Sequence, residues 1–262
     1  MKFKKVLLTL SLGLSLALVP TLSFAHDASP AAAPQIEVLP KAKTKLKENS
    51  KKPAVVESDT TAKILNEKGN VVGKRTFKSN KTDDADSQAS IAATRTVTVL
   101  AVADEEYRSA YGDWQTRIQN IVEYADNAFN RDHAIDFQVH ALAAWSSQGG
   151  NSSQILQDLG RDFDGLGYDF VVGFTRDSAF DAGGIAYVYG SAPYGSALSV
   201  NLDQGVTNTW HASQHEFSHN FGLGHDPQGS GIRCIMNYDY SYSVDYWHPE
   251  HDSQIEQNEY WY

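Results

Sequence analysis

Cysteine is almost absent from this chain, which has one, Cys234, among its 262 residues. A disulfide framework is therefore excluded, even for a protein in an oxidising compartment. Lysine is absent from residues 94–262, which carry 7 Arg against 23 Asp and Glu. Residues 1–93 are basic instead, with 14 Lys and 1 Arg against 9 acidic residues. This break predicts two regions with different roles. It also makes the acidic region a poor binder of nucleic acid, because it offers few cations to phosphate groups.

Long apolar runs are also scarce. The run from Val6 to Val19 is too short to span a bilayer comfortably as a permanent helix. Three lysines precede it and the stretch Ser23-Phe24-Ala25 follows it, so we expect a signal peptide at residues 1–25 that is cleaved after Ala25. The protein would then be secreted and extracellular, with no membrane attachment; a retained N-terminal anchor is the alternative. No later segment is apolar enough to span a membrane.

Residues 26–93 contain one aromatic residue, Phe77, and little hydrophobic periodicity, so we do not expect them to bury a core of their own. A strand or hairpin is expected near Thr61 to Phe77, where the sequence NEKGN at residues 66–70 predicts a turn. We interpret this region as a largely irregular pro-segment that covers the acidic domain and is later removed. The alternative is a flexible linker.

Residues 94–262 have the periodicity of a folded domain. Apolar residues at three- and four-residue steps predict one long helix over 107–129. Further helices are expected from Ser152 or Ser153, over 208–221 and over 252–262, and strands at 96–102, 135–141, 168–174, 185–189 and 197–202. Strands that first alternate with helices and then follow one another indicate a mixed α/β (α+β) domain.

Three of the 9 histidines lie in the stretch HEFSHNFGLGHD at residues 215–226. His215 and His219 are four residues apart and would project from one face of a helix, where two imidazole nitrogens can bind one zinc ion. Glu216 is rotated off that face, toward a water molecule on the metal, as a general base must be. The pattern therefore predicts a metal centre with an acid–base group beside it.

A continued helix would carry His225 away from this metal. Gly222 is a residue that can adopt a left-handed conformation, end the helix and turn the chain back, so that His225 becomes the third ligand. Three histidines and one open position are typical of a catalytic zinc site, whereas a closed structural site has four protein ligands. Surface histidines without a metal are the alternative.

The motif HExxHxxGxxH at residues 215–225 resembles that of the metzincin zinc endopeptidases, and the resemblance covers most of residues 95–262. The whole pattern is most similar to secreted bacterial adamalysin/astacin-like enzymes of bacilli. The resemblance implies a twisted sheet with two long helices above a cleft and an irregular lower subdomain that ends in a helix. It also implies an edge strand containing Gly184, Ile185 and Ala186 that pairs with the substrate backbone; an ordinary exposed edge strand is the alternative.

Residues 234–238, CIMNY, resemble the Met-turn of that family, in which Met236 would form an apolar floor beneath the histidines. Asp226 resembles the adamalysin type, whose cysteine at this turn is normally disulfide-bonded. Cys234 has no partner in the chain, and we expect a small buried thiol. Tyr238 is similar to the astacin tyrosine, which ligates zinc and stabilises the transition state; a packing tyrosine at the cleft wall is the alternative.

Weaker patterns give three further expectations. Asp162 and Asp164 lie in a DFDG stretch that faintly resembles a calcium loop, so Ca²⁺ is a possible second cofactor. Five further histidines are expected to be ordinary surface or core residues: His133, His140, His211, His248 and His251. A carboxylate among Asp83, Asp84 and Asp86 could silence the zinc in a precursor, as in some astacins.

These observations predict a secreted, monomeric zinc endopeptidase that is synthesised as a zymogen. It would hydrolyse protein or peptide substrates by a zinc-activated water, with Glu216 as the general base, and its own pro-segment would be a partner. The alternatives are an exported non-catalytic metal-binding or adhesive module, and a zinc hydrolase of non-peptide amides.

Overall fold

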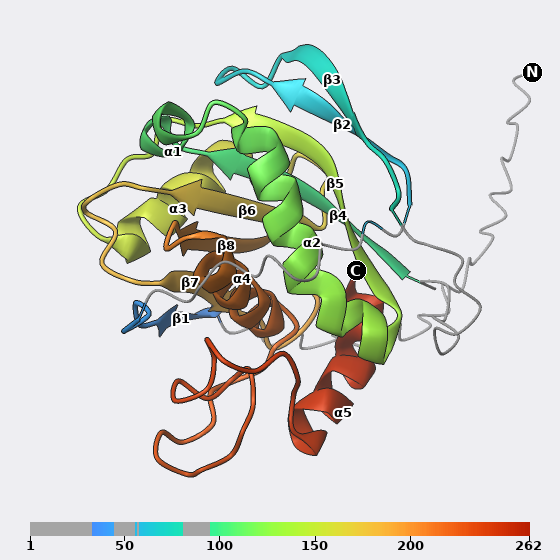
Figure 1. Cartoon of the computed structure of the whole chain (residues 1–262), viewed down its shortest axis with the longest axis vertical. Coiled ribbons are helices and arrows are strands. Elements are labelled where there is room, and N and C mark those ends of the chain that lie inside the picture. The colour runs from blue at the N-terminus through green and yellow to red at the C-terminus, as the bar shows by residue number, and fades with distance from the viewer. Residues whose placement is uncertain (1–32, 45–55, 57, 81–94) are drawn as a thin grey trace, which may run out of the picture. The chain divides into compact units, whose positions relative to one another are not determined.

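The centre of the fold is one eight-stranded mixed sheet with the strand order β1-β7-β8-β6-β4-β5-β2-β3 (Figure 1). The structure is a computed structural model that describes residues 33–44, 56, 58–80 and 95–262. The expected signal peptide, residues 1–25, and Asp83, Asp84 and Asp86 lie outside the described residues. The strands are β1 (Gln35–Leu39), β2 (Thr60–Leu65), β3 (Val71–Phe77), β4 (Arg95–Ala103), β5 (Ile135–Ala144), β6 (Phe170–Thr175), β7 (Gly184–Val188) and β8 (Ala197–Leu202).

Five neighbouring strands of the sheet are parallel to one another: β8, β6, β4, β5 and β2. β4 pairs with β5 and with β6, and β6 pairs with β8, all in parallel, whereas β7 is antiparallel to β8. Every residue of β6 is buried, as expected for a parallel strand covered on both faces. The helices are α1 (Glu105–Ala110), α2 (Trp114–His133), α3 (Ser152–Phe163), α4 (Val206–Asn220) and α5 (Pro249–Asn258), followed by a 3-10 turn at Glu259–Trp261.

Two apolar cores lie on opposite faces of the sheet. α2 and α4 cover one face, where Phe217 of α4 stacks on Phe137 of β5 with ring centroids 4.9 Å apart. α3 covers the other face with Ile155, Leu156 and Leu159. This arrangement confirms the expected mixed α/β class, and it fixes α4 directly beneath β7 and β8.

The predicted helix over 107–129 is two helices in the structure. Asp104 caps α1 by accepting a hydrogen bond from the backbone N–H of Tyr107, and α1 ends at Tyr111, whose backbone is extended. α2 begins after Asp113 and continues to His133. The prediction was wrong because Tyr107 and Tyr111 both face the core, so the hydrophobic spacing continues across a break in the backbone.

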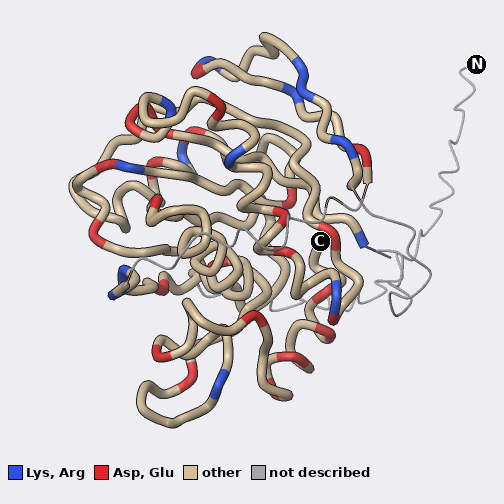
Figure 2. The backbone as a smooth tube through the Cα atoms, viewed as in Figure 1, with Lys and Arg blue, Asp and Glu red and all other residues tan. Residues whose placement is uncertain are grey.

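The described part of residues 26–93 contributes three strands to the sheet. β2 and β3 form the hairpin expected near Thr61 to Phe77, and β2 pairs with β5 in parallel. Basic residues of the hairpin are visible in Figure 2, and Arg75 pairs with Asp113 at 2.7 Å. β1 was not predicted, and it lies at the other end of the sheet, antiparallel to β7. Within the described ranges, no helix has the length and apolar character needed to cross a bilayer.

Candidate metal centre

The central helix of the candidate site is α4, which carries His215, Glu216 and His219. All three side chains are completely buried, because α4 packs between the sheet and α2. The helix ends at Phe221, and Gly222 follows with a φ of 88°. The predicted left-handed conformation at residue 222 is therefore confirmed, and the chain turns back at the point that the spacing of the motif required.

The turn brings the three imidazoles together. Nε2 of His225 lies 3.0 Å from Nε2 of His215 and 2.9 Å from Nε2 of His219. Within the described part of the chain, these three residues form one of two groups able to hold a metal ion. The sequence motif thus corresponds to one point in space, toward which three Nε2 atoms converge.

The hydrogen bonds of the three rings determine which nitrogen is free. His215 Nδ1 donates to the carbonyl of Ile235 at 2.8 Å, and His219 Nδ1 donates to the carbonyl of Leu223 at 2.7 Å. A carbonyl can only accept, so both Nδ1 atoms carry the proton and both Nε2 atoms present a lone pair. Such hydrogen bonds from the other ring nitrogen are typical of metal-ligating histidines.

His225 is held in the same way. The Tyr238 hydroxyl donates to the carbonyl of Val38 at 2.8 Å, so its oxygen accepts from Nδ1 of His225 at 3.0 Å. Nε2 of His225 then also presents a lone pair. Three lone pairs that face one another without a proton repel, and a cation at their centre removes that repulsion. The residues present therefore fit a zinc ion bound by three neutral imidazoles.

Burial keeps these imidazoles neutral. It lowers the pKa of His215 to about 3, with a further contribution from His225, and it lowers the pKa of His225 to about 4. Burial also holds the pKa of His219 well below its usual value. Neutral imidazole is the form that binds a metal, so the environment favours ligation throughout the neutral pH range.

Glu216 is a carboxyl group in a completely buried environment. Neither carboxylate oxygen has a hydrogen-bond partner among the described residues. Burial raises the pKa of Glu216 well above its usual value, and the Glu37 carboxylate raises it further. A Cβ atom at Gly184 would overlap the Glu216 carboxylate, so β7 passes this close only because residue 184 is glycine. A buried carboxyl group with a raised pKa suits proton transfer near neutral pH.

β7 is not a free edge strand in this structure. β1 pairs with it antiparallel from Gln35–Val188 to Leu39–Gly184, and Glu37 lies opposite Ala186. The expectation that Gly184, Ile185 and Ala186 form an exposed edge is therefore corrected, because a segment of the same chain occupies the outer hydrogen-bonding positions of β7.

β1 also contacts the histidine site through side chains. Glu37 Oε2 lies 3.2 Å from Nδ1 of His225, and the Tyr242 hydroxyl donates to the carbonyl of Pro40 at 2.9 Å. Tyr238 and Tyr242 thus hold β1 and the residue after it across the site, through Val38 and Pro40. Sequence reasoning missed Glu37, because no local pattern connects a strand near residue 37 to a histidine near residue 225.

Met236 is completely buried in a tight turn. Its carbonyl accepts from the backbone N–H of Asp226 at 3.1 Å, and Asn237 N–H donates to the carbonyl of Cys234 at 3.1 Å. The turn is therefore fastened to the chain immediately after His225. Cys234 is a buried free thiol, as expected.

The remaining expectations have mixed outcomes. Asp162 and Asp164 are in neither described metal-binding group, and Asp164 accepts a hydrogen bond from the backbone N–H of Ser196 at 2.8 Å. His211 donates to the carbonyl of Thr207, as an ordinary core histidine would. His248 and His251 both face Asp226 and Cys234, with which they form the second group, and their expected role as ordinary residues stays a prediction.

Three converging imidazoles able to hold a metal ion lie beside a buried carboxyl group that has no hydrogen-bond partner among the described residues. Residues 93–248 match the model described as metallo-peptidase family M12, and the chain belongs to this family. The match extends from the start of β4 past α4 and the turn at Met236. The chain thus contains a metallopeptidase domain.

One solved chain, described as "Structure of a chaperone-substrate complex", is similar to this chain with a TM-score of 0.51 and 16% sequence identity. The alignment covers 71% of this chain and 38% of that chain. At this identity the likeness shows the fold alone. No curated protein matched the sequence.

Proposed function

We propose that this chain is the precursor of a secreted zinc endopeptidase of the metzincin type, most similar to the bacterial adamalysin/astacin-like enzymes. The observation that carries the proposal is the convergence of three Nε2 lone pairs next to Glu216, whose buried carboxylate has no described hydrogen-bond partner. A site for metal storage or adhesion has no need of such a carboxylate, because burying an unpaired acid costs free energy.

The residues divide the chemistry between them. His215, His219 and His225 would hold the zinc ion, which when bound lowers the pKa of a water molecule and polarises a peptide carbonyl. Glu216 would accept the proton of the attacking water and pass it to the leaving amine, a role that its raised pKa suits. The buried Met236 would support the histidines from below, through the turn that is fastened to the His225 loop.

The position of β1 supports an extended peptide as the substrate. A peptide that replaced β1 would pair with Gly184, Ile185 and Ala186 of β7 by backbone hydrogen bonds, independently of its sequence. The Tyr238 hydroxyl now donates to a backbone carbonyl of β1. After exchange it would donate to a carbonyl of the substrate instead, and it would stabilise the negative charge that develops there.

The same position supports a latent precursor. While β1 pairs with β7 and Glu37 faces His225, a substrate strand cannot take that place. We therefore propose that residues 26–93 act as the pro-segment and that release of β1 opens the site. Export, cleavage after Ala25 and a monomeric state are parts of the same proposal.

The test is hydrolysis of casein by the processed protein, with Glu216→Gln as the decisive variant and Glu256→Gln, on the exposed side of α5, as the matched control. We expect Glu216→Gln to retain zinc and to lose activity by at least about 100-fold, as for removal of a general base. Full activity in that variant rejects the assignment. Inactivity of the zinc-loaded wild type on casein, together with hydrolysis of small non-peptide amides, would favour the other hydrolase class.

A further inference from the structure

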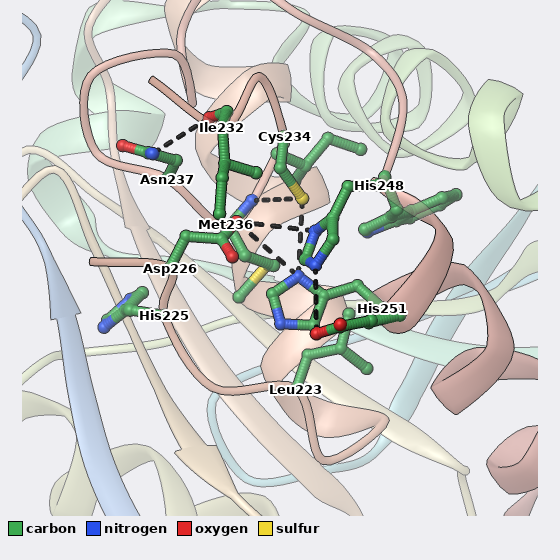
Figure 3. Close-up of polar contacts among 12 residues, drawn as sticks. Leu223, His225, Asp226, Ile232, Cys234, Met236, Asn237, His248 and His251 are labelled. Carbon is green, nitrogen blue, oxygen red and sulfur yellow. Dashed lines mark hydrogen bonds and ion pairs between the residues drawn. The ribbon is translucent and has the colours of Figure 1, made fainter. Parts of the chain in front are cut away.

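A second cluster of ligand-type side chains lies behind the turn at Met236. It consists of Asp226, Cys234, His248 and His251, and we call it the rear cluster. Asp226 follows His225, and Cys234 lies two residues before Met236. His248 is the N-cap of α5 and His251 lies in its first turn. Figure 3 shows the four side chains turned toward one another, while His225 is turned away from them.

The spacing within the rear cluster is that of ligands around one ion. Sγ of Cys234 lies 3.4 Å from Nδ1 of His251. Oδ2 of Asp226 lies 3.6 Å from Nδ1 of His248 and 3.7 Å from Nδ1 of His251. All four ligand atoms lie within 4.8 Å of one another. Zinc–ligand bonds of about 2.0–2.3 Å in a tetrahedron place neighbouring ligand atoms about 3.3–3.8 Å apart.

Hydrogen bonds account for only part of the rear cluster, where Cys234 Sγ and His251 Nδ1 form one at 3.4 Å. The separations between Asp226 and the two histidines exceed the length of a hydrogen bond. Asp226 Oδ2 and His248 Nδ1 are both buried without a hydrogen-bond partner among the described residues, and the Asp226 side chain is only 6% exposed. Leaving a buried carboxylate uncompensated is costly, and a cation at the centre of the four atoms compensates it.

We propose that the rear cluster is a second metal site, which binds zinc or a similar divalent transition metal through four protein ligands. One thiolate, two imidazoles and one carboxylate form a donor set suited to zinc, and four ligands close the coordination sphere, as in structural rather than catalytic sites. The proposal does not rest on peptidase activity.

The position of the rear cluster gives this metal a structural role. The four ligands come from three segments: the chain after His225, the turn before Met236, and the start of α5. The chain cannot form an internal disulfide, because Cys234 is its one cysteine. A bound ion would cross-link these segments and stabilise the folded state in the way that structural zinc does.

Cobalt distinguishes the two sites, because only the rear cluster contains sulfur. We would load the purified full-length protein with Co²⁺, measure bound metal by elemental analysis and record the absorption spectrum. We expect two equivalents per chain and a thiolate-to-cobalt charge-transfer band in the near ultraviolet. Cys234→Ser should lose that band. His251→Ala should lose one of the two equivalents, while His140→Gln, a histidine outside both groups, should keep both.

A variant of the front site, which consists of His215, His219 and His225, completes the test. His219→Ala should retain the thiolate band and at least one equivalent, because its site contains no sulfur. A wild-type protein without the band when saturated with Co²⁺ would overturn the proposal, and this result requires no variant to fold. A band that persists in Cys234→Ser would overturn it equally.

Discussion

The glycine that ends α4 gives the sharpest test of how the histidines are assembled. Gly222 has a φ of 88°, and a Cβ at this position would lie 2.9 Å from the backbone carbonyl oxygen of Tyr189 and 2.9 Å from the Trp261 ring. The left-handed conformation costs an alanine about 1–2 kcal/mol, and the contact with a backbone atom adds about 1 kcal/mol of strain. We therefore expect Gly222→Ala to destabilise the protein by about 2–3 kcal/mol.

Gly224 is a matched control, because its φ is not positive and a Cβ there would meet no atom within 4 Å. Gly222→Ala should lower the Tm by about 4–12 °C in a domain of this size, and it should reduce zinc retention because His225 is displaced. Gly224→Ala should change the free energy of unfolding by less than about 0.5 kcal/mol. Thermal unfolding by circular dichroism measures both. Equal shifts in the two variants would refute the requirement for a left-handed residue at 222.

Two further predictions concern β1 and a buried carboxylate. Glu37→Ala should raise the casein activity of the full-length precursor about fivefold relative to Gln35→Ala. The reason is that removing a partly exposed contact with His225 weakens the binding of β1 by about 1 kcal/mol. If the activity of the precursor did not change, Glu37 would have no role in holding β1 in place. Burial opposes ionisation of Asp203, but hydrogen bonds from Tyr111 and Arg117 outweigh it and hold the pKa of Asp203 below 3.8. The stabilisation of the folded state by the ionised Asp203 carboxylate is therefore complete above pH 3.8. It is lost as the pH falls through the lower pKa that Asp203 has in the folded state. Asp203→Asn should cost about 3–5 kcal/mol at pH 7, and its Tm difference from the wild type should shrink below pH 3.8; a constant difference would contradict the assignment.

The features that could be predicted from the sequence are those encoded over short distances. α4, the shared face of His215 and His219 and the left-handed residue at Gly222 all follow from spacings of three to seven residues. Helical periodicity and glycine conformation act over that range, so one short segment was sufficient. The break between α1 and α2 is also local, but hydrophobic spacing alone does not detect it.

The features that could not be predicted depend on contacts between distant segments. β1 has no clear alternation of buried and exposed residues, so its sequence lacks the pattern that predicts a strand. It is a strand because its backbone pairs with β7. Glu37 reaches His225 only through that pairing. The rear cluster likewise has no recognisable spacing, because His248 and His251 approach Asp226 and Cys234 only after α5 has packed against the turn.

The two groups able to hold a metal ion meet at one peptide bond, between His225 and Asp226. The Asp226 side chain is turned into the rear cluster and the His225 side chain is turned away from it (Figure 3), so one segment can serve the front histidines and the rear cluster together. The Asp226 N–H donates to the carbonyl of Met236, which fixes the backbone between the two groups. An ion in the rear cluster would therefore hold the backbone from which His225 extends. Loss of that ion would loosen the position of the His225 imidazole more than the positions of His215 and His219, because those two residues belong to a buried helix.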